Sequence, residues 1–322
     1  MRLLPAFKYL RVVKSLFANR LNGEDVYPFY ASLKVTNKCR FRCKFCNVWM
    51  EDTPELDTKG MKKILDNLSD SSVILVSFEG GEPLLRPDIE ELLQYASRKS
   101  FYLLFTTSER RLERYPMEKY CKYIDFLHIS IDEGHKNLYM FKNLEQYREW
   151  NRNVCIQTVV TVDDLPELEW KVERCYQAGV KIVVMPAVHL DKTEDFYPDT
   201  EQFMNACLGL KARFPKTISS PDRYLKALHN GTGCSSSSLI IDVDGKLFYP
   251  CRKLDIKTAD LTKVDLHRYL KSVDAVKYRG MMAKCGEHCG WYQYFATPSF
   301  TSISAIKDAL KPYWAYIFSR GR

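Results

Sequence analysis

The segment Cys39-Arg-Phe-Arg-Cys43-Lys-Phe-Cys46 places three cysteines within eight residues, directly after the β-prone stretch 29–36. Three thiolates on one loop can hold three irons of a cubane cluster and leave the fourth iron without a protein ligand. An open iron can bind a substrate or cofactor, whereas a closed four-cysteine cluster only passes electrons. The spacing therefore predicts an iron–sulfur cluster with one open position.

A zinc site is the alternative for this loop. Zinc needs four ligands, and the loop offers three. The next cysteine along the chain is Cys121 and the next histidine is His128, and neither is near in sequence. An open cluster is the better fit, and zinc completed by a distant side chain stays as the alternative.

The composition narrows the class of protein. With 322 residues, 46% hydrophobic and 27% charged, the chain can form one large or two modest domains of ordinary globular type. No apolar run has the length of a membrane span. Lys8, Arg11 and Lys14 interrupt the apolar residues at the N-terminus, which is unlike a secretory signal. We therefore expect a cytoplasmic protein.

The net charge of +8 is moderate for this length. A nucleic-acid surface would show a dense basic stripe with interleaved stacking aromatics, and the sequence has none. We do not expect a nucleic-acid partner.

Eleven cysteines are many for a protein of this kind. Seven of them fall into two groups, which suggests metal binding in a reducing compartment. The groups are Cys39, Cys43 and Cys46, and Cys234, Cys251, Cys285 and Cys289. The others are expected to be buried free thiols: Cys121, Cys155, Cys175 and Cys207.

Strand-like and helix-like segments alternate from about residue 29 to residue 214. The expected strands are residues 29–36, 72–78, 102–107, 124–132, 154–162 and 181–186, and the clearest helices are 89–98, 138–152 and 168–178. Short apolar runs between helices indicate βαβ units and a parallel sheet. We expect an α/β fold, a partial (β/α)6 TIM-like barrel, with a doubly wound sheet as the alternative.

The character of the chain changes after residue 214. Residues 215–238 are rich in Ser, Pro, Gly and Thr, and Asp244-Gly245 between two short apolar runs predicts a hairpin. A helical stretch at 264–282 leads to Cys285. The predicted segments are an N-terminal helix (1–28), a core (29–214), a small α+β domain (215–295) and a C-terminal helix (296–322).

A second motif links the first cysteine group to a known family. Gly80-Gly81-Glu82-Pro83 closes the second expected strand. A CxxxCxxC loop followed by a strand, a helix and this turn resembles the radical S-adenosylmethionine (radical SAM) enzymes. The resemblance implies that Gly80, Gly81 and Glu82 contact the methionine part of SAM, and that Phe45 packs near its adenine. Glycines suit such close backbone approach.

Other matches to the radical SAM pattern are weaker. Ser130 and Asp132 end the fourth expected strand and resemble family positions that reach the SAM ribose or carboxylate; strand-end caps are the alternative. Thr106-Thr107-Ser108 stands where many members have Thr-Thr-Asn. Gly134-His135-Lys136-Asn137 replaces the usual HDxxRG-like stretch, which puts the family's arginine contact in doubt.

The C-terminal cysteines resemble the shortened auxiliary-cluster domain called Twitch, related to SPASM. In that domain a cysteine precedes a hairpin, a second follows it, and a helix leads to a close pair. The resemblance implies that Cys234, Cys251, Cys285 and Cys289 close a second 4Fe-4S cluster, used as an electron relay or a structural staple. A four-cysteine zinc site is the alternative.

The family resemblance implies two 4Fe-4S clusters, SAM, and an electron donor such as ferredoxin or flavodoxin. SAM would be cleaved reductively to a 5′-deoxyadenosyl radical that takes hydrogen from the substrate. The substrate stays open between a lipid or membrane-proximal small molecule, a peptide, and an alcohol such as an aminocyclitol. Only 38 residues precede Cys39, too few for the winged-helix domain of many peptide maturases. A non-catalytic zinc or iron–sulfur protein is the alternative from another class.

The two ends of the chain suggest the membrane-proximal substrate. Residues 3–21 and 306–318 are basic, apolar and aromatic at helical spacing, as in helices that lie in a membrane interface. The alternative is that these helices cap the barrel, with their apolar faces in the core and their basic faces in water.

Overall fold

The computed structural model describes residues 2–23, 25–188, 196–231, 234–286 and 289–300. The chain forms two compact units. The first comprises Met1–Arg42, Asn47–Leu127 and Ser235–Cys285, and the second Cys43–Cys46, His128–Cys234 and Gly286–Arg322. No helix among the described residues is long and apolar enough to cross a membrane.

The sheet of the first unit has the strand order β3-β2-β1-β7-β8-β9. Its first four members pair in parallel, and β8 and β9 continue the sheet in antiparallel fashion. The strands are β1 Tyr30–Thr36, β2 Leu75–Gly80, β3 Tyr102–Thr107, β7 Ser238–Ile241, β8 Lys246–Phe248 and β9 Lys257–Asp260.

The two faces of this sheet differ in polarity. Leu33, Phe78 and Phe105 lie in register on neighbouring strands and are buried on the apolar face. Ser32 and Ser77 are buried one residue earlier, on the opposite face. Because successive side chains of a strand point to opposite faces, one face packs and the other is lined by polar groups.

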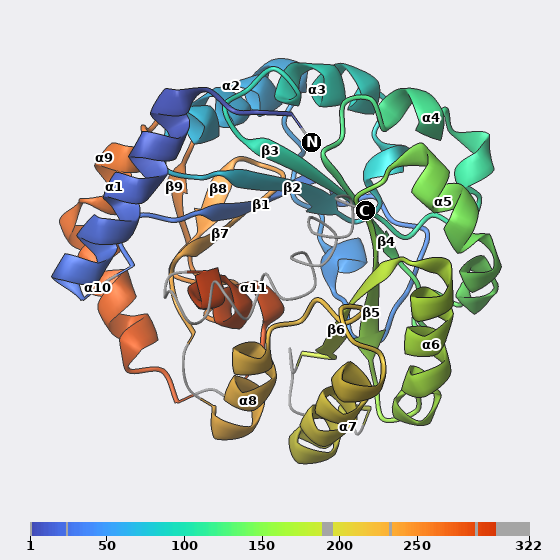
Figure 1. Cartoon of the computed structure of the whole chain (residues 1–322). Coiled ribbons are helices and arrows are strands. Elements are labelled where there is room, and N and C mark those ends of the chain that lie inside the picture. Colours follow the sequence, from blue (N-terminus) through green and yellow to red (C-terminus); the bar gives the residue numbers. More distant parts are fainter. Residues whose placement is uncertain (1, 24, 189–195, 232–233, 287–288, 301–322) are drawn as a thin grey trace. The chain divides into compact units, whose positions relative to one another are not determined.

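Helices α2 and α3 cover the apolar face of β1 to β3 (Figure 1). The helices of the first unit are α1 Ala6–Asn22, α2 Thr58–Ser69, α3 Ile89–Ala96, α4 Met117–Tyr120, α9 Leu266–Leu270 and α10 Val273–Ala283. Three short 3-10 helices are η1 Val48–Met50, η2 Pro83–Leu85 and η3 Leu112–Arg114.

The second unit repeats the strand–helix alternation. Strand β4, Phe126–Ser130, contributes its last residues to this unit, and β5 pairs with β6 in parallel. The further elements are β5 Val154–Val160, β6 Lys181–Pro186, α5 Leu144–Trp150, α6 Leu168–Ala178, α7 Thr200–Arg213, α8 Asp222–Asn230, α11 Tyr292–Ala296, η4 Leu138–Asn143, η5 Leu165–Glu167 and η6 Thr297–Phe300. Helices α5 and α6 flank these strands (Figure 1).

The predicted α/β class is confirmed. All six expected strands of the core are present, and residues 102–107 and 181–186 match to the residue. The predicted helix 138–152 begins as the 3-10 helix η4 before α5, and the stretch 215–238 holds helix α8, which its composition did not indicate. The predicted hairpin is formed by β7 and β8, and Gly245 takes the positive φ of +81° that its turn requires.

The four predicted domains are continuous segments of the sequence, whereas each of the two units combines several segments that are in contact in space. The predicted domains therefore remain a prediction. Strand β7 pairs with β1, so residues 235–285 pack with the first unit. The predicted C-terminal helix at 306–318 lies outside the described residues.

Candidate active site

The cysteine loop begins directly after β1. Cys43 is buried, and Cys39 and Cys46 are half-buried. The Phe41 amide donates to the Cys39 sulfur at 3.4 Å, and the Cys46 amide donates to the Cys43 carbonyl at 3.1 Å. Among the described residues, no three His, Cys, Asp or Glu side chains are grouped as a metal site. The cluster assignment therefore remains a prediction from the spacing.

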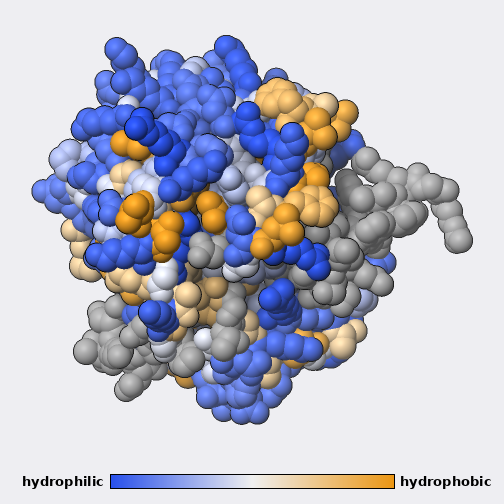
Figure 2. All heavy atoms as spheres, turned by 90° about the vertical axis from the view of Figure 1, so that its left-hand side faces the viewer, coloured by the Kyte–Doolittle hydropathy of each residue, from blue (hydrophilic) through white to orange (hydrophobic). Residues whose placement is uncertain are grey.

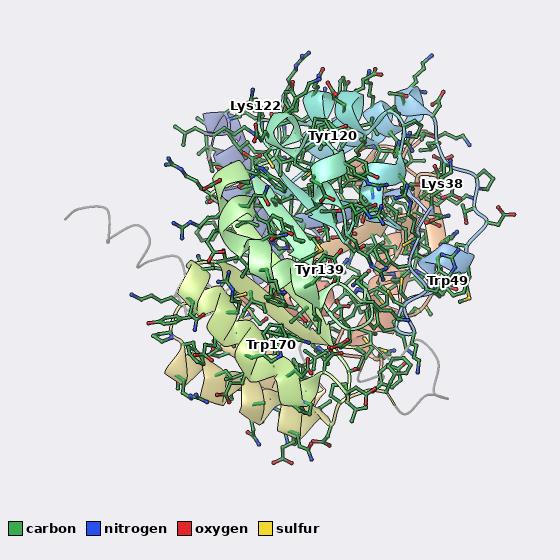
Figure 3. The ribbon with its side chains drawn as sticks, turned by 90° about the vertical axis from the view of Figure 1, so that its right-hand side faces the viewer. Lys38, Trp49, Tyr120, Lys122, Tyr139 and Trp170 are labelled. Atoms are coloured by element: carbon green, nitrogen blue, oxygen red, sulfur yellow. The ribbon has the colours of Figure 1, made fainter. Side chains whose placement is uncertain are left out.

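Lys38 and Trp49 bracket the cysteine loop. Figure 3 places both at the same edge of the first unit, whereas Tyr120 and Lys122 lie away from it. The Arg42 guanidinium stacks 4.6 Å above the Trp49 ring, a cation–π contact that anchors the loop on the side of η1.

The Gly80–Gly81 turn packs against the residues that lead into this loop. The Gly81 amide donates to the Thr36 carbonyl at 2.7 Å, and the Glu82 amide donates to the Lys38 carbonyl at 2.8 Å. A Cβ on Gly80, whose φ is +140°, would lie 2.2 Å from the Thr36 oxygen. A Cβ on Gly81 would lie 2.3 Å from the Lys38 oxygen. The two glycines thus allow the turn to touch the backbone just before Cys39.

The carboxylate of Glu82 is fully buried within the first unit. It accepts hydrogen bonds from the Thr107 hydroxyl (2.8 Å), from the Ser108 amide and hydroxyl (2.7 and 3.1 Å) and from the Leu84 amide (3.1 Å). Burial raises the pKa of Glu82, and these donors oppose the rise. The Glu82 carboxylate thus accepts four hydrogen bonds from the protein. Those from Thr107 and Ser108 hold the glycine turn against the end of β3.

Asn37 is a residue that the sequence did not single out. It lies at the end of β1, two residues before Cys39, and its side chain is 8% exposed. Its backbone amide donates to Glu55 at 3.0 Å, but both side-chain amide atoms are buried without a hydrogen-bond partner. Buried amides are normally satisfied, so this group marks a place where a polar ligand would fit. In the sequence, the one feature that could have pointed to Asn37 is its position as an asparagine between a buried strand and the cysteine loop.

In the second unit, the end of β4 meets the later part of the cysteine loop. The Cys43 thiol donates to the Gly134 carbonyl at 3.2 Å, and the Phe45 ring contacts His135 edge to face at 5.9 Å between centroids. A Cβ on Gly134 would lie 2.2 Å from the Phe45 ring. The stretch that departs from the family pattern therefore packs against the aromatic residue predicted to lie near adenine.

Asp132 organises this turn. Its carboxylate accepts from the His135 backbone amide at 2.9 Å and lies 2.7 Å from His135 Nδ1. Burial lowers the pKa of His135, but the Asp132 charge outweighs it, so that pKa lies well above its usual value. Asn137 donates to the Ser130 carbonyl at 2.8 Å and accepts from the Asp132 amide at 3.1 Å. The sequence pointed to His135 and Asn137 only as part of the stretch that replaces the HDxxRG-like motif, and it did not predict their contacts with Asp132 and Ser130.

Comparison with known proteins identifies the family. The family model described as the radical SAM superfamily matches residues 33–204, which is more than half of the chain.

The chain belongs to the radical SAM superfamily.

Two curated relatives illustrate the range of this match. The PqqA peptide cyclase of Bradyrhizobium diazoefficiens is 36% identical over 90 residues, covering 27% of this chain and 24% of that protein. An S-adenosylmethionine-dependent nucleotide dehydratase of Selenomonas ruminantium is 32% identical over 108 residues, covering 32% of this chain and 39% of that protein. The chain thus spans about a quarter to two fifths of the length of these relatives.

Two solved structures share the fold of this chain. Streptococcus suis SuiB bound to the precursor peptide SuiA superposes with a TM-score of 0.63 at 15% identity, covering 91% of this chain and 77% of that one. The structure of anSMEcpe with bound AdoMet and a peptide gives 0.62 at 12% identity, covering 91% and 97%. These likenesses support the predicted barrel over the doubly wound alternative.

The C-terminal cysteines of this radical SAM protein are distributed over both units. Cys251 and Cys285 belong to the first and Cys234 and Cys289 to the second. Cys251 is buried and follows the predicted hairpin, and the others are half-buried. The auxiliary cluster remains a prediction. The four scattered cysteines are buried free thiols, as predicted, and burial raises the pKa of Cys121, Cys155 and Cys207 to about 12.

An ion-pair network joins the regions around the two cysteine groups within the first unit. Arg252, next to Cys251, contacts Glu51 at 2.7 Å, and Lys34 on β1 bridges Glu51 (2.9 Å) and Asp242 (3.2 Å). Burial raises the pKa of Asp242, but Lys34 and Lys257 outweigh it and hold that pKa below its usual value. The network fixes the hairpin that precedes Cys251 against β1.

Proposed function

We propose that this chain is a radical SAM enzyme that takes hydrogen from a peptide substrate. The chemistry of the donor set fits the cofactor, because three cysteines share one loop and the unpartnered amide of Asn37 lies two residues before the first. When bound, the cluster and SAM supply a one-electron cleavage that yields methionine and a 5′-deoxyadenosyl radical. Cys39, Cys43 and Cys46 would hold the cluster.

The observation that carries the proposal is the contact between the glycine turn and the cysteine loop. Two backbone hydrogen bonds, from Gly81 to Thr36 and from Glu82 to Lys38, bind the turn to the chain entering the loop. The turn that the family resemblance assigns to SAM is thereby held, within the first unit, against the residues that lead into Cys39. Phe45 would pack near the adenine of SAM, and Ser130 and Asp132 would reach its ribose or carboxylate. Asn37 would donate a hydrogen bond to a polar atom of SAM.

The peptide class is supported by the curated relatives. The PqqA peptide cyclase match has the highest identity of those cited, 36% over 90 residues, and no comparison supports a lipid substrate. An electron donor such as ferredoxin or flavodoxin would reduce the cluster. A second 4Fe-4S cluster on Cys234, Cys251, Cys285 and Cys289 would relay electrons or hold the C-terminal part in place.

Anaerobic reconstitution with iron and sulfide, followed by dithionite and SAM, tests the first step. Mass spectrometry should detect 5′-deoxyadenosine with the native chain and none with Cys39→Ala. Cys121→Ala, which changes a buried thiol outside both groups, is the matched control and should retain the product. A Cys39→Ala protein that still forms 5′-deoxyadenosine would contradict the assignment.

Iron content tests the second cluster separately. The native chain should bind about eight irons, the sum of two cubanes, and Cys251→Ala about four. Stoichiometric zinc with no iron would instead support the non-catalytic alternative.

Asn37→Ala tests the amide. The side chain makes no hydrogen bond, so we expect little change in stability but a higher KM for SAM, about tenfold for one lost buried hydrogen bond. An unchanged KM would remove Asn37 from the site.

The substrate class is tested by adding peptide, nucleotide or lipid fractions of cell extract to the turnover assay. A peptide fraction should raise 5′-deoxyadenosine formation and show a peptide of changed mass. Stimulation confined to nucleotides would favour the chemistry of the nucleotide dehydratase relative, and stimulation confined to lipids would restore the lipid alternative.

A further inference from the structure

Helix α1 turns its polar side chains inward and its apolar side chains outward. Its buried residues are Lys8, Ser15 and Asn19. On the helix, the exposed fractions are 52% for Phe7, 62% for Leu10, 64% for Phe17 and 85% for Leu21, and Leu3, which precedes the helix, is 89% exposed. An ordinary surface helix of a globular protein has the opposite arrangement. For α1, the alternative in which this apolar face packs in the core is therefore wrong.

Specific polar contacts fix this orientation. Lys8 Nζ donates to the carbonyls of Ser69 and Ser71 at 3.1 and 2.8 Å. Asn19 exchanges two hydrogen bonds of 2.9 Å with the backbone of Tyr27. Rotating the helix to bury its leucines and phenylalanines would leave these groups unpaired, and unpaired buried groups are costly.

The exposed apolar residues of α1 share one side of the helix. Phe7, Leu10, Phe17 and Leu21 recur at intervals of three, four or seven, which places them on one side of α1, and Leu3 is exposed just before the helix begins. Figure 2 looks onto the side of the molecule where α1 lies and shows hydrophobic side chains gathered there among hydrophilic ones. We call these five residues the α1 face.

The charges around the α1 face have one sign. Residues 2–23 contain five basic residues and no acidic one: Arg2, Lys8, Arg11, Lys14 and Arg20. Arg2 pairs with Asp125, and Lys8 is buried. Lys14 and Arg20 are exposed on α1. A helix with exposed aromatic and aliphatic side chains and two exposed cations, Lys14 and Arg20, matches an anionic lipid surface, where acyl chains contact the apolar face and headgroups pair with the cations.

We propose that α1 docks this protein on anionic membranes, with the α1 face lying in the plane of the interface. Two other partners that could cover the α1 face complement its basic charge less well. A second copy would bring the same basic residues, Lys14 and Arg20, and no complementary acidic charge on its α1. The terminal residues 301–322 carry four basic residues and one acidic residue, so their charge is also of the same sign. The proposal does not depend on the proposed function.

The position of α1 determines what docking would do. Lys8 contacts Ser69 and Ser71, which precede β2, and the Tyr9 and Tyr102 hydroxyls lie 2.7 Å apart at the start of β3. The cysteine loop and the Gly80–Gly81 turn follow the opposite ends of β1 and β2. Within the first unit, docking would therefore keep the catalytic edge turned away from the bilayer. The membrane would localise the enzyme and leave the site open to a water-borne substrate.

Vesicle flotation tests the proposal. The full chain should float with vesicles of equal phosphatidylglycerol and phosphatidylcholine, and much less with phosphatidylcholine alone. The triple variant Phe7→Ser, Leu10→Ser, Phe17→Ser should lose at least about tenfold in binding, because the anchoring area is removed. Val273→Ser with Val276→Ser, which alters exposed apolar residues of α10, is the matched control and should bind normally.

The double variant Lys14→Gln, Arg20→Gln tests the electrostatic contribution to vesicle binding. Binding to anionic vesicles at low salt should weaken about fivefold for each charge removed. Circular dichroism should show native folding for every variant. Failure of the native chain to float with anionic vesicles, or equal flotation of the triple variant, would overturn the proposal. A dimer that the triple variant abolishes, without vesicle binding, would assign the α1 face to a second copy and also overturn it. Formation of 5′-deoxyadenosine in vesicle-free buffer should be unchanged throughout, which separates this test from that of the proposed function.

Discussion

Helices α1 and α2 both belong to the first unit, and both have amphipathic sequences, yet they face the protein with opposite sides. Helix α2 buries Met61, Ile64, Leu65 and Leu68. Helix α1 buries a lysine, a serine and an asparagine. Helical periodicity therefore identifies a helix, but the surface that receives it decides which side turns inward. Helix α2 meets an apolar sheet face, whereas α1 meets the backbone carbonyls of Ser69 and Ser71, which accept hydrogen bonds from Lys8.

The largest expected effect is in α2. Leu65→Ala should lower the free energy of unfolding by about 2–5 kcal/mol, because Leu65 is fully buried and truncation leaves a cavity. Urea denaturation measures the change. A cost below about 1 kcal/mol would mean that α2 is not part of a packed core.

Lys8 supplies the next test, through pH. Burial, aided by the neighbouring Arg11, lowers the pKa of Lys8 to about 7. Between that pKa and the ordinary lysine value, the unfolded chain binds a proton that the folded chain does not, so stability rises with pH. Relative to Lys8→Met, the native chain should gain about 2 kcal/mol between pH 7 and pH 9.

Urea denaturation of both proteins at pH 6, 7, 8 and 9 checks this prediction, since other titrating groups cancel in the difference. Parallel stability curves would show that Lys8 is not desolvated, and the inward polar face of α1 would then lose its main support.

The two helices also differ in their N-terminal caps, and the expected effect on stability is smaller. Asp57 caps α2 by accepting from the Gly60 amide at 2.7 Å, whereas α1 starts after Pro5 with no side-chain cap. Asp57→Ala should cost about 1 kcal/mol of stability. Asp57→Asn, which keeps the acceptor, should restore most of it. Equal losses in both variants would show that charge, and not the hydrogen bond, stabilises the first turn of α2.

The smallest expected effect is the counterpart of the first. Leu10→Ala on α1 should change stability by no more than about 0.5 kcal/mol, because the leucine is 62% exposed. The same measurement as for Leu65 applies. A loss comparable to that of Leu65→Ala would mean that the α1 face is covered within the protein, and membrane docking would have no free surface.

The strands were the most predictable part of the fold. Residues 102–107 and 181–186 were predicted to the residue because buried parallel strands are continuous apolar runs bounded by polar turns. Helix α8 was not predicted, because its strongly amphipathic turns lie inside a stretch rich in Ser, Pro and Gly. The segment predicted as one helix forms the 3-10 helix η4, which buries Met140 and Phe141, and then the α-helix α5. A single sequence does not show this change of helix type.

The candidate site was predictable where residues are adjacent in the chain. The other residues of the site are Asn37, His135 and Asn137. Each is a single polar side chain whose role depends on residues that lie near it only in the folded protein. The unpartnered amide of Asn37 and the pairing of Asp132 with His135 depend on burial and distance. The sequence had instead emphasised Glu82 as a ligand contact, and the structure commits its carboxylate to Thr107 and Ser108.

The sequence by itself determined the family, the cysteine loop, the glycine turn and the strands that position them, because covalent spacing and hydrophobic periodicity are local properties. Only the tertiary structure decided that the glycines contact the backbone of β1, that Glu82 is buried and that α1 faces outward. Each of those outcomes depends on partners that are distant along the chain, and the free energy of burial is set by the partner as much as by the residue.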